Sequence, residues 1–233
     1  MLEKINLLKS NTYTKYALFL SILMSLAPNA EAFQPKEVII LRHAEKLIQK
    51  NNGSSLSAKG MARSTAIASF FKNHYQEYFL GEPDIIVATD PGPLSKNPAK
   101  SYTIRELQTV SPLSNMLAIE HPDKDYSIFH PLTSEQPEQM AKLLLTDPKF
   151  DGKIIVICWN NTNINTLTKA LGVTQTLDPW LDSDYQKIYD IRFNPTAVLN
   201  PIPNPPYTIN TKIGENWEIL NNLINGVNEL SKR

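Results

Sequence analysis

The sequence predicts a three-layer α/β domain in which a mostly parallel central sheet is covered by helices on both faces. Short β-branched runs alternate along the chain with segments of helical period, an order typical of parallel strands joined by crossover helices. Two of the runs, 38–41 and 154–158, are apolar at every position, as expected for strands buried on both faces. The chain has 23 basic and 23 acidic residues, and this balance gives no electrostatic footprint for nucleic acid.

The first 32 residues are expected to be a signal peptide that is removed. A lysine-containing opening precedes the apolar stretch 16–26, and Ala30-Glu31-Ala32 has the small-x-small pattern of a cleavage site. The apolar stretch is shorter than the ~20 residues that a membrane span needs. The alternative is an uncleaved anchor. We expect cleavage after Ala32, export to the periplasm or medium, no stable membrane insertion after processing, and one domain over residues 33–233.

The elements of the first half are expected in the order strand, helix, strand, helix, strand. Val38–Leu41 is the first strand, and Ser57 is a suitable N-cap for a helix that runs to about residue 72. A second strand covers 84–89. A helix is expected from about 100 to 110. A weak strand is expected at 116–119.

The second half is expected to continue the alternation. A helix at 134–145 precedes the strand 153–158, and a helix at 163–171 ends at Gly172, a suitable C′ residue. The strand 187–193 follows. The proline-rich stretch 195–206 is expected to be a rigid surface connection. A short strand at 207–211 and an amphipathic helix around Trp217 end the chain.

Cys158 is the only cysteine, so no disulfide can form within the chain and packing alone must stabilise the fold. Its position inside an apolar strand favours a buried structural thiol over a reactive one.

Arg42 and His43 carry the strongest chemical signal. They end the first predicted strand, and open α/β sheets bind ligands at the carboxyl ends of their strands. An imidazole can act as a nucleophile, and the planar fork of a guanidinium matches phosphate oxygens. The pair therefore predicts phosphate chemistry through a histidine. The alternative is a strand that ends in two solvated polar residues.

Four segments, in this order, resemble the motifs of the histidine phosphatase superfamily, which has the phosphoglycerate-mutase-like fold. They are Arg42-His43-Ala44-Glu45, the Leu-Ser-x-x-Gly-x-x-Arg stretch 56–63, the Ser-x-x-x-Arg-x-x-Gln-Thr stretch 101–109, and the strand 154–158 with its continuation to Ile164. A branch of the family has Trp-x-His at the fourth place, where this chain has Trp159-Asn160-Asn161.

The resemblance implies a phosphomonoesterase in which His43 becomes a phosphohistidine that water hydrolyses. Arg42 and Arg105 are the catalytic partners that hold the phosphoryl oxygens, with Asn161 as a further phosphate-binding group. No metal or other cofactor is implied. The expected ligand is a phosphorylated small molecule or a phosphorylated side chain; the oligomeric state is not indicated.

The departure at Asn161 keeps two hypotheses open. An amide can donate a neutral hydrogen bond but supplies no positive charge. The chain is therefore either a phosphatase of reduced activity or a non-catalytic module of the cell envelope that binds phosphorylated ligands. We favour the enzyme, because His43, Arg42 and Arg105 are all present.

The remaining charged candidates are expected to lie outside the site. Arg63 lies either near the phosphate pocket or on the solvated face of a helix, and we favour the second. Glu45 and Lys46 match the pattern of the branch, and the alternative is that they pair on the surface. The other histidines, at 74, 121 and 130, are expected to be ordinary surface residues. No general acid is assigned among the candidates Asp90, Glu120, Asp182 and Asp184.

Overall fold

The computed structural model describes residues 33–47, 54–92, 103–194, 196–203 and 205. The expected strand at 207–211 and the helix around Trp217 lie outside these residues, as do residues 1–32. No helix within the described ranges is long and apolar enough to cross a bilayer. The elements are β1 (Glu37–Arg42), α2 (Ala58–Tyr78), β2 (Ile85–Ala88), α3 (Arg105–Glu120), α4 (Pro137–Thr146), the 3-10 helix η1 (Pro148–Phe150), β3 (Ile154–Trp159), α5 (Ile164–Ala170), β4 (Ile188–Phe193) and β5 (Ala197–Ile202).

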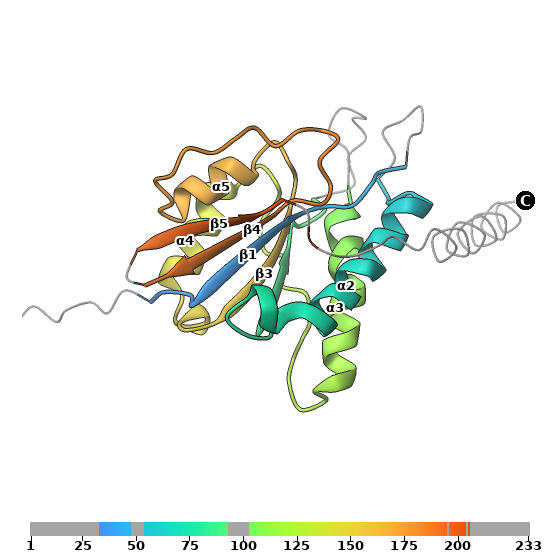
Figure 1. Ribbon diagram of the computed structural model, residues 1–233, viewed down its shortest axis with the longest axis horizontal. Helices are drawn as coiled ribbons and strands as arrows, with labels where there is room; N and C mark the ends of the chain where they lie inside the picture. The colour runs from blue at the N-terminus through green and yellow to red at the C-terminus, as the bar shows by residue number, and fades with distance from the viewer. Residues whose placement is uncertain (1–32, 48–53, 93–102, 195, 204, 206–233) are drawn as a thin grey trace, which may run out of the picture. The chain divides into compact units, whose positions relative to one another are not determined.

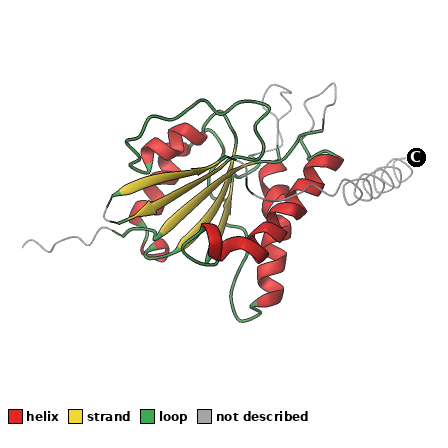
Figure 2. Cartoon of the chain, in the orientation of Figure 1, coloured by secondary structure: helices red, strands yellow, loops and turns green. Residues whose placement is uncertain are grey.

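The five strands form one sheet in the order β2-β3-β1-β4-β5 (Figures 1 and 2). Strand β1 lies at the centre and pairs in parallel with β3, and β3 pairs in parallel with β2. Strand β4 is antiparallel to both of its neighbours, β1 and β5, so it alone runs against the other four. The predicted α/β class with a mostly parallel sheet is confirmed.

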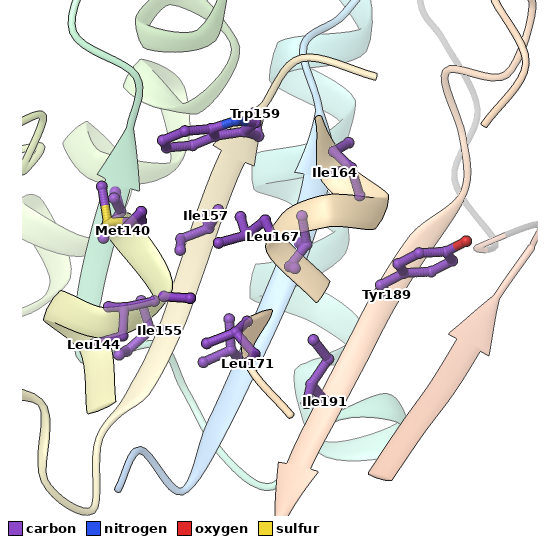
Figure 3. Close-up of a cluster of buried hydrophobic side chains, with 14 of the residues drawn as sticks. Met140, Leu144, Ile155, Ile157, Trp159, Ile164, Leu167, Leu171, Tyr189 and Ile191 are labelled. Carbon is purple, nitrogen blue, oxygen red and sulfur yellow. The ribbon is translucent and has the colours of Figure 1, made fainter. Parts of the chain in front are cut away.

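Alternate residues of β1 contribute to separate cores on the two faces of the sheet. Val38 and Ile40 belong to a cluster with α4 and α5, which includes Met140 and Leu167 (Figure 3). Ile39 and Leu41 belong to the opposite cluster with α2 and α3. Because every residue of β1 is buried, helices cover the sheet on both sides, as the unbroken apolar run predicted.

Helix α3 is longer than predicted because a neighbouring hydroxyl compensates for its proline. Pro112 has no N–H to donate to the carbonyl of Gln108, one turn earlier. The buried Ser64 of α2 donates its hydroxyl to that carbonyl at 2.9 Å. The helix therefore continues to Glu120, and the strand expected at 116–119 is wrong.

Strand β5 corrects the prediction of a rigid surface connection over 195–206. It contains Pro201, which lies opposite Tyr189 of β4. Strand β5 ends the sheet in the described structure, and an edge strand tolerates a proline because one side needs no ladder hydrogen bonds. Helix α2 also exceeds its prediction and runs to Tyr78.

Two predicted helix ends are confirmed. Ser57 is the N-cap of α2 and accepts a hydrogen bond from the Gly60 N–H at 3.1 Å. Gly172, just past α5, has a φ of 96°, a conformation that glycine adopts without the cost of a Cβ clash.

A buried carboxyl pair lies at the amino end of β1, away from the residues that follow its carboxyl end. Glu37 accepts a hydrogen bond from the Leu80 N–H at 2.9 Å and is fully buried. Burial and the hydrogen bond and charge of Asp190 raise the pKa of Glu37 to about 8. The pair therefore shares a proton, which Glu37 holds at neutral pH.

This pair predicts a loss of stability as the pH rises. The pKa of Glu37 is about 8 in the folded chain against its ordinary value of 4.5. Its contribution to the free energy of unfolding is therefore complete below a pH of about 4.5 and is lost as the pH rises through about 8. In denaturant titrations, Glu37→Gln should lose less free energy of unfolding than wild type between pH 5 and pH 8. The exposed Glu77→Gln is the control. Parallel curves for wild type and Glu37→Gln would contradict the assignment.

Candidate active site

His43 lies directly beyond the carboxyl end of the central strand. Its backbone N–H donates to the Trp159 carbonyl of β3 at 3.2 Å, which continues the β1–β3 ladder past Arg42. This is the sheet edge at which open α/β folds bind ligands. The polar residues that end β1 are buried, with Arg42 4% and His43 3% exposed, so the alternative of two solvated strand-end residues is wrong.

The His43 ring is oriented by the backbone of the next residue. Its Nδ1 lies 2.7 Å from the Ala44 carbonyl oxygen. A carbonyl only accepts hydrogen bonds, so Nδ1 carries the proton and Nε2 keeps its lone pair. Burial and the charges of Arg105, Arg42 and Lys46 lower the pKa of His43 to about 3. The imidazole is therefore neutral at physiological pH, with Nε2 available as a nucleophile.

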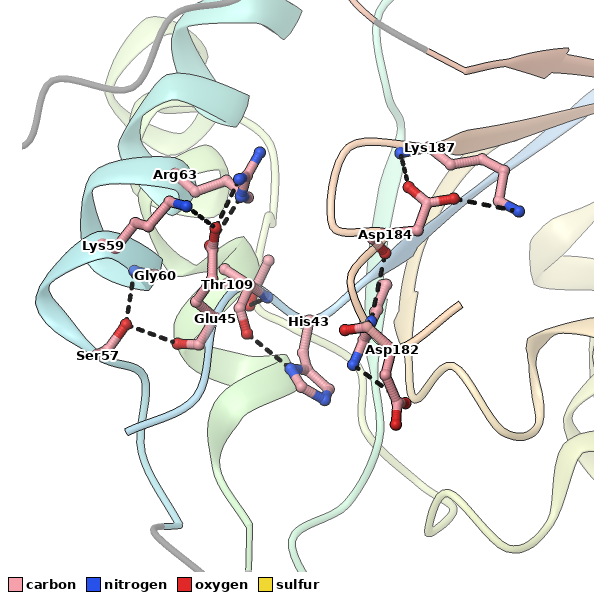
Figure 4. Close-up of polar contacts among 12 residues, drawn as sticks. His43, Glu45, Ser57, Lys59, Gly60, Arg63, Thr109, Asp182, Asp184 and Lys187 are labelled. Atoms are coloured by element: carbon pink, nitrogen blue, oxygen red, sulfur yellow. Dashed lines mark hydrogen bonds and ion pairs between the residues drawn. The ribbon is translucent and has the colours of Figure 1, made fainter. Parts of the chain in front are cut away.

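The Leu-Ser-x-x-Gly-x-x-Arg segment holds the turn that follows His43. The Ser57 N–H and hydroxyl donate to the Glu45 carbonyl at 2.8 and 3.2 Å. The Arg63 guanidinium donates through two nitrogens to the two oxygens of the Glu45 carboxylate at 2.8 and 2.6 Å (Figure 4). Burial raises the pKa of Glu45, but the Arg63 hydrogen bonds and the charges of Arg63 and Lys59 together hold that pKa below its usual value.

The expectation for Arg63 and Glu45 is corrected by this pair. Arg63 is 5% exposed, and its carboxylate partner is also largely covered. Sequence reasoning missed the role because the two residues lie in different elements. A fork-to-fork pair with a carboxylate fixes both side chains in one geometry, so the pair ties α2 to the loop behind His43.

Gly60 completes this contact by lacking a side chain. A Cβ at Gly60 would lie 2.2 Å from the Glu45 carbonyl oxygen. We expect Gly60→Ala to destabilise the fold by about 1–3 kcal/mol, the usual cost of overpacking, and to lower any turnover by displacing the turn after His43. Thermal unfolding and activity measure the two effects. Gln76→Ala, exposed in the last turn of α2, is the control. A fully stable and active Gly60→Ala variant would contradict the close approach.

Helix α3 fixes the same turn from the other side. The Thr109 hydroxyl accepts from the Ala44 N–H at 2.9 Å and donates to the Arg105 carbonyl at 2.7 Å. The Gln108 side chain accepts from the Leu56 N–H at 2.8 Å. The Gln-Thr pair of the third motif therefore joins the first two motifs. Ser101 and Tyr102, which begin that motif, lie outside the described residues.

Arg42 is bound by the loop between α5 and β4. Its Nη1 donates to the carbonyls of Leu181, Asp182 and Asp184 at 3.0, 2.8 and 3.4 Å. The Tyr185 ring covers its guanidinium at 4.0 Å and lies 6.3 Å from the His43 ring, centroid to centroid. Burial lowers the pKa of Arg42, yet an arginine remains charged.

Arg105 is placed by the first turn of α3. Its Nε donates to the Thr103 hydroxyl at 2.8 Å, which leaves its terminal nitrogens for other acceptors. Its charge lowers the pKa of both His43 and Arg42. The three predicted catalytic groups therefore lie within electrostatic reach of one another, although they come from β1 and α3.

Asn161 has a partner that the sequence did not indicate. Its Nδ2 donates to the Asp182 carboxylate at 2.8 Å, and the same carboxylate oxygen lies 4.0 Å from Arg42 Nη2. The expectation that Asp182 lies outside the site is therefore wrong. The loop 181–185 is 139 residues or more beyond Arg42, and nothing local in the sequence marks that contact.

The other acidic candidates have partners of their own. The Asp184 carboxylate pairs with Lys187 at 3.2 Å. Asp90 lies just past β2 and contacts His130 Nδ1 at 3.3 Å. Glu120 pairs with Lys72 at the amino end of β2, away from His43.

One group in the described structure has three potential metal ligands. Glu82, Glu120 and His121 bring their ligand atoms within 4.8 Å of one another. Glu82 precedes β2, so the group lies at the opposite edge of the sheet from His43 and has no part in the candidate active site.

Two buried groups, Glu106 and Cys158, border the site and make no contact described above. Glu106, beside Arg105, is 1% exposed, and burial raises its pKa. Cys158 is fully buried and burial raises its pKa also, which agrees with the predicted structural thiol.

No family model and no curated protein sequence matches the chain. Three solved structures are similar to it. A protein assigned as the phosphohistidine phosphatase SixA from Agrobacterium tumefaciens has a TM-score of 0.49 and 16% identity, with 72% of this chain and 98% of that chain covered. A SixA assignment from Nakamurella multipartitia has a TM-score of 0.43 and 12% identity, covering 76% and 99%.

The third structure is a mycobacterial glucosyl-3-phosphoglycerate phosphatase, with a TM-score of 0.42 and 14% identity, covering 73% of this chain and 98% of that chain. All three matches cover 98% or more of the neighbour's own chain.

Proposed function

We propose that the protein is a phosphomonoesterase that acts through a phosphohistidine at His43. The observation that carries this proposal is the contact of 2.7 Å between His43 Nδ1 and the Ala44 carbonyl. It assigns the proton to Nδ1 and leaves Nε2 as the attacking atom. The low pKa of His43, about 3, keeps this nitrogen unprotonated at physiological pH.

In the first step, Nε2 of His43 forms a bond to phosphorus while the bond from phosphorus to the leaving oxygen breaks. The leaving oxygen takes up a proton. In the second step, a water oxygen forms a bond to phosphorus while the bond from phosphorus to His43 Nε2 breaks. The water loses a proton, inorganic phosphate is released, and Nε2 regains its lone pair. Arg42 and Arg105 hold the phosphoryl oxygens and balance the charge on them, because fixed cations stabilise such a transition state without reorganisation.

The substrate class we propose is a phosphorylated small molecule or a phosphorylated side chain. We also propose that the protein acts outside the cytoplasm, with residues 1–32 as the signal that directs export. N-terminal sequencing of the protein recovered from the periplasm or medium would begin at Phe33 if cleavage follows Ala32; a retained Met1 would favour the uncleaved anchor.

A second candidate is a non-catalytic module that binds phosphorylated ligands. One observation favours it: two of the groups expected to bind phosphate already donate hydrogen bonds within the chain. Arg42 Nη1 donates to three carbonyls, and the Asn161 amide donates to Asp182. A module of this kind keeps the cations that bind phosphate and has no need of turnover.

One experiment separates the two candidates. Turnover of p-nitrophenyl phosphate by the purified chain is measured beside the melting temperature in inorganic phosphate. Turnover that disappears in His43→Ala supports the enzyme. A phosphate-dependent rise in melting temperature without turnover, reduced in Arg105→Ala, supports the binding module. If the wild type shows neither turnover nor a phosphate-dependent rise in melting temperature, the phosphate site at His43 is contradicted.

A further inference from the structure

Asp182 is held by its own backbone beside Arg42, the residue that precedes the candidate nucleophile. Arg42 Nη1 donates to the Asp182 carbonyl at 2.8 Å and to the carbonyls of Leu181 and Asp184 in the same loop at 3.0 and 3.4 Å. A buried guanidinium that binds three carbonyls of one loop fixes that loop. Residue 182 is therefore placed next to Arg42 whatever its side chain does.

The Asp182 side chain projects from this fixed backbone into solvent. It is 96% exposed, and its Oδ1 lies 4.0 Å from Arg42 Nη2. The Asn161 amide donates to the same Oδ1 at 2.8 Å. Figure 4 shows the Asp182 carboxylate on the same side of the site as the His43 ring. One carboxyl oxygen is thus positioned by an amide. The other has no hydrogen-bond partner among the described residues and is open to a ligand.

The other carboxylates near the site are less suited to exchange a proton with a bound ligand. Asp184 is paired with Lys187 at 3.2 Å, and Glu45 is bound by both nitrogens of Arg63. Asp90 accepts from the Gly92 N–H at 2.7 Å. Asp182 alone among these four combines exposure with a contact to Arg42.

We propose that Asp182 is the acid–base group of this site and that Asn161 positions it. The proposal rests on the function proposed above. The protonated Asp182 carboxyl donates its proton to the leaving oxygen as the bond from that oxygen to phosphorus breaks. The resulting carboxylate takes a proton from the water that attacks the phosphohistidine, which restores the starting state. Asn161 positions this carboxyl group through the hydrogen bond from its amide.

The test is the dependence of turnover on the leaving group. A p-nitrophenolate leaves without needing a proton, whereas the alkoxide of glycerol phosphate needs one. Loss of a general acid costs about 10²–10⁴-fold in rate, so Asp182→Asn should lose at least about 10²-fold of kcat on glycerol 2-phosphate and less than about tenfold on p-nitrophenyl phosphate. Asn161→Ala should show the same selectivity in weaker form. Asp178→Asn, exposed on the same loop, is the matched control and should turn over both substrates normally.

Three results would overturn the role of Asp182. Equal losses on both substrates would make the residue merely structural. Tighter inorganic phosphate binding together with faster turnover of both substrates in Asp182→Asn would mean that the carboxylate only occupies the anion site. A selective loss in Glu106→Gln but not in Asp182→Asn would assign the proton to Glu106. A wild type that turns over neither substrate would overturn the proposed function and this role together, so the two failures are distinguishable.

Discussion

Replacing His43 by alanine is expected to reduce turnover by roughly 10⁴-fold or more, because covalent nucleophiles are among the most costly groups to remove. The variant keeps Arg42, Arg105 and their partners, so phosphate should still raise its melting temperature. The loss should appear in kcat rather than in phosphate binding. Steady-state kinetics and a phosphate titration of the melting temperature measure the two properties.

His74→Ala is the matched control for His43→Ala. His74 lies on α2 and contacts Glu77 at 3.1 Å, outside the candidate site, so its removal should leave turnover unchanged. Turnover that survives in His43→Ala would mean that another group attacks phosphorus. Equal losses in the two variants would trace the effect to the fold.

Replacing Arg105 by alanine is expected to lower kcat by about 10²–10³-fold, the usual cost of losing one donor to a developing anion. Arg105 also lowers the pKa of His43, so the variant should bind a proton at His43 more readily. Arg105→Lys keeps the charge but loses the fork, and should retain an intermediate rate.

The Arg105 series has its own control in Arg192→Lys. Arg192 lies on β4 and donates to Asp190 at 2.8 Å, far from His43 along the sheet. A rate for Arg105→Ala within about threefold of wild type would remove this guanidinium from the transition state, since the usual cost of such a loss is far larger.

The part of the fold that local sequence determines was predicted well. The buried strands β1 and β3 followed from unbroken apolar runs, and the cap Ser57 and the terminal Gly172 followed from their conformational preferences. These features depend on neighbours within a few residues. The longer course of α3 did not follow, because it depends on Ser64 of another helix.

The candidate site divides in the same way. Arg42, His43 and Arg105 could be named from motifs, and both arginines lower the pKa of His43. Their catalytic roles stay predictions. The groups that orient them could not be named from motifs. The Ala44 carbonyl is common to any backbone, and the loop that binds Arg42 is separated from it by 139 residues or more. Such contacts are created by folding and leave no local pattern in the sequence.

The most direct test of the account is to trap the covalent intermediate. The full chain is mixed with excess p-nitrophenyl phosphate and quenched rapidly in base, because a phosphorylated imidazole is lost in acid. Peptide mass spectrometry then locates the added group. We expect one phosphoryl group on His43, absent from His43→Ala. Turnover with no phosphoryl group on His43 at any quench time, or with the group on another residue, would contradict the account.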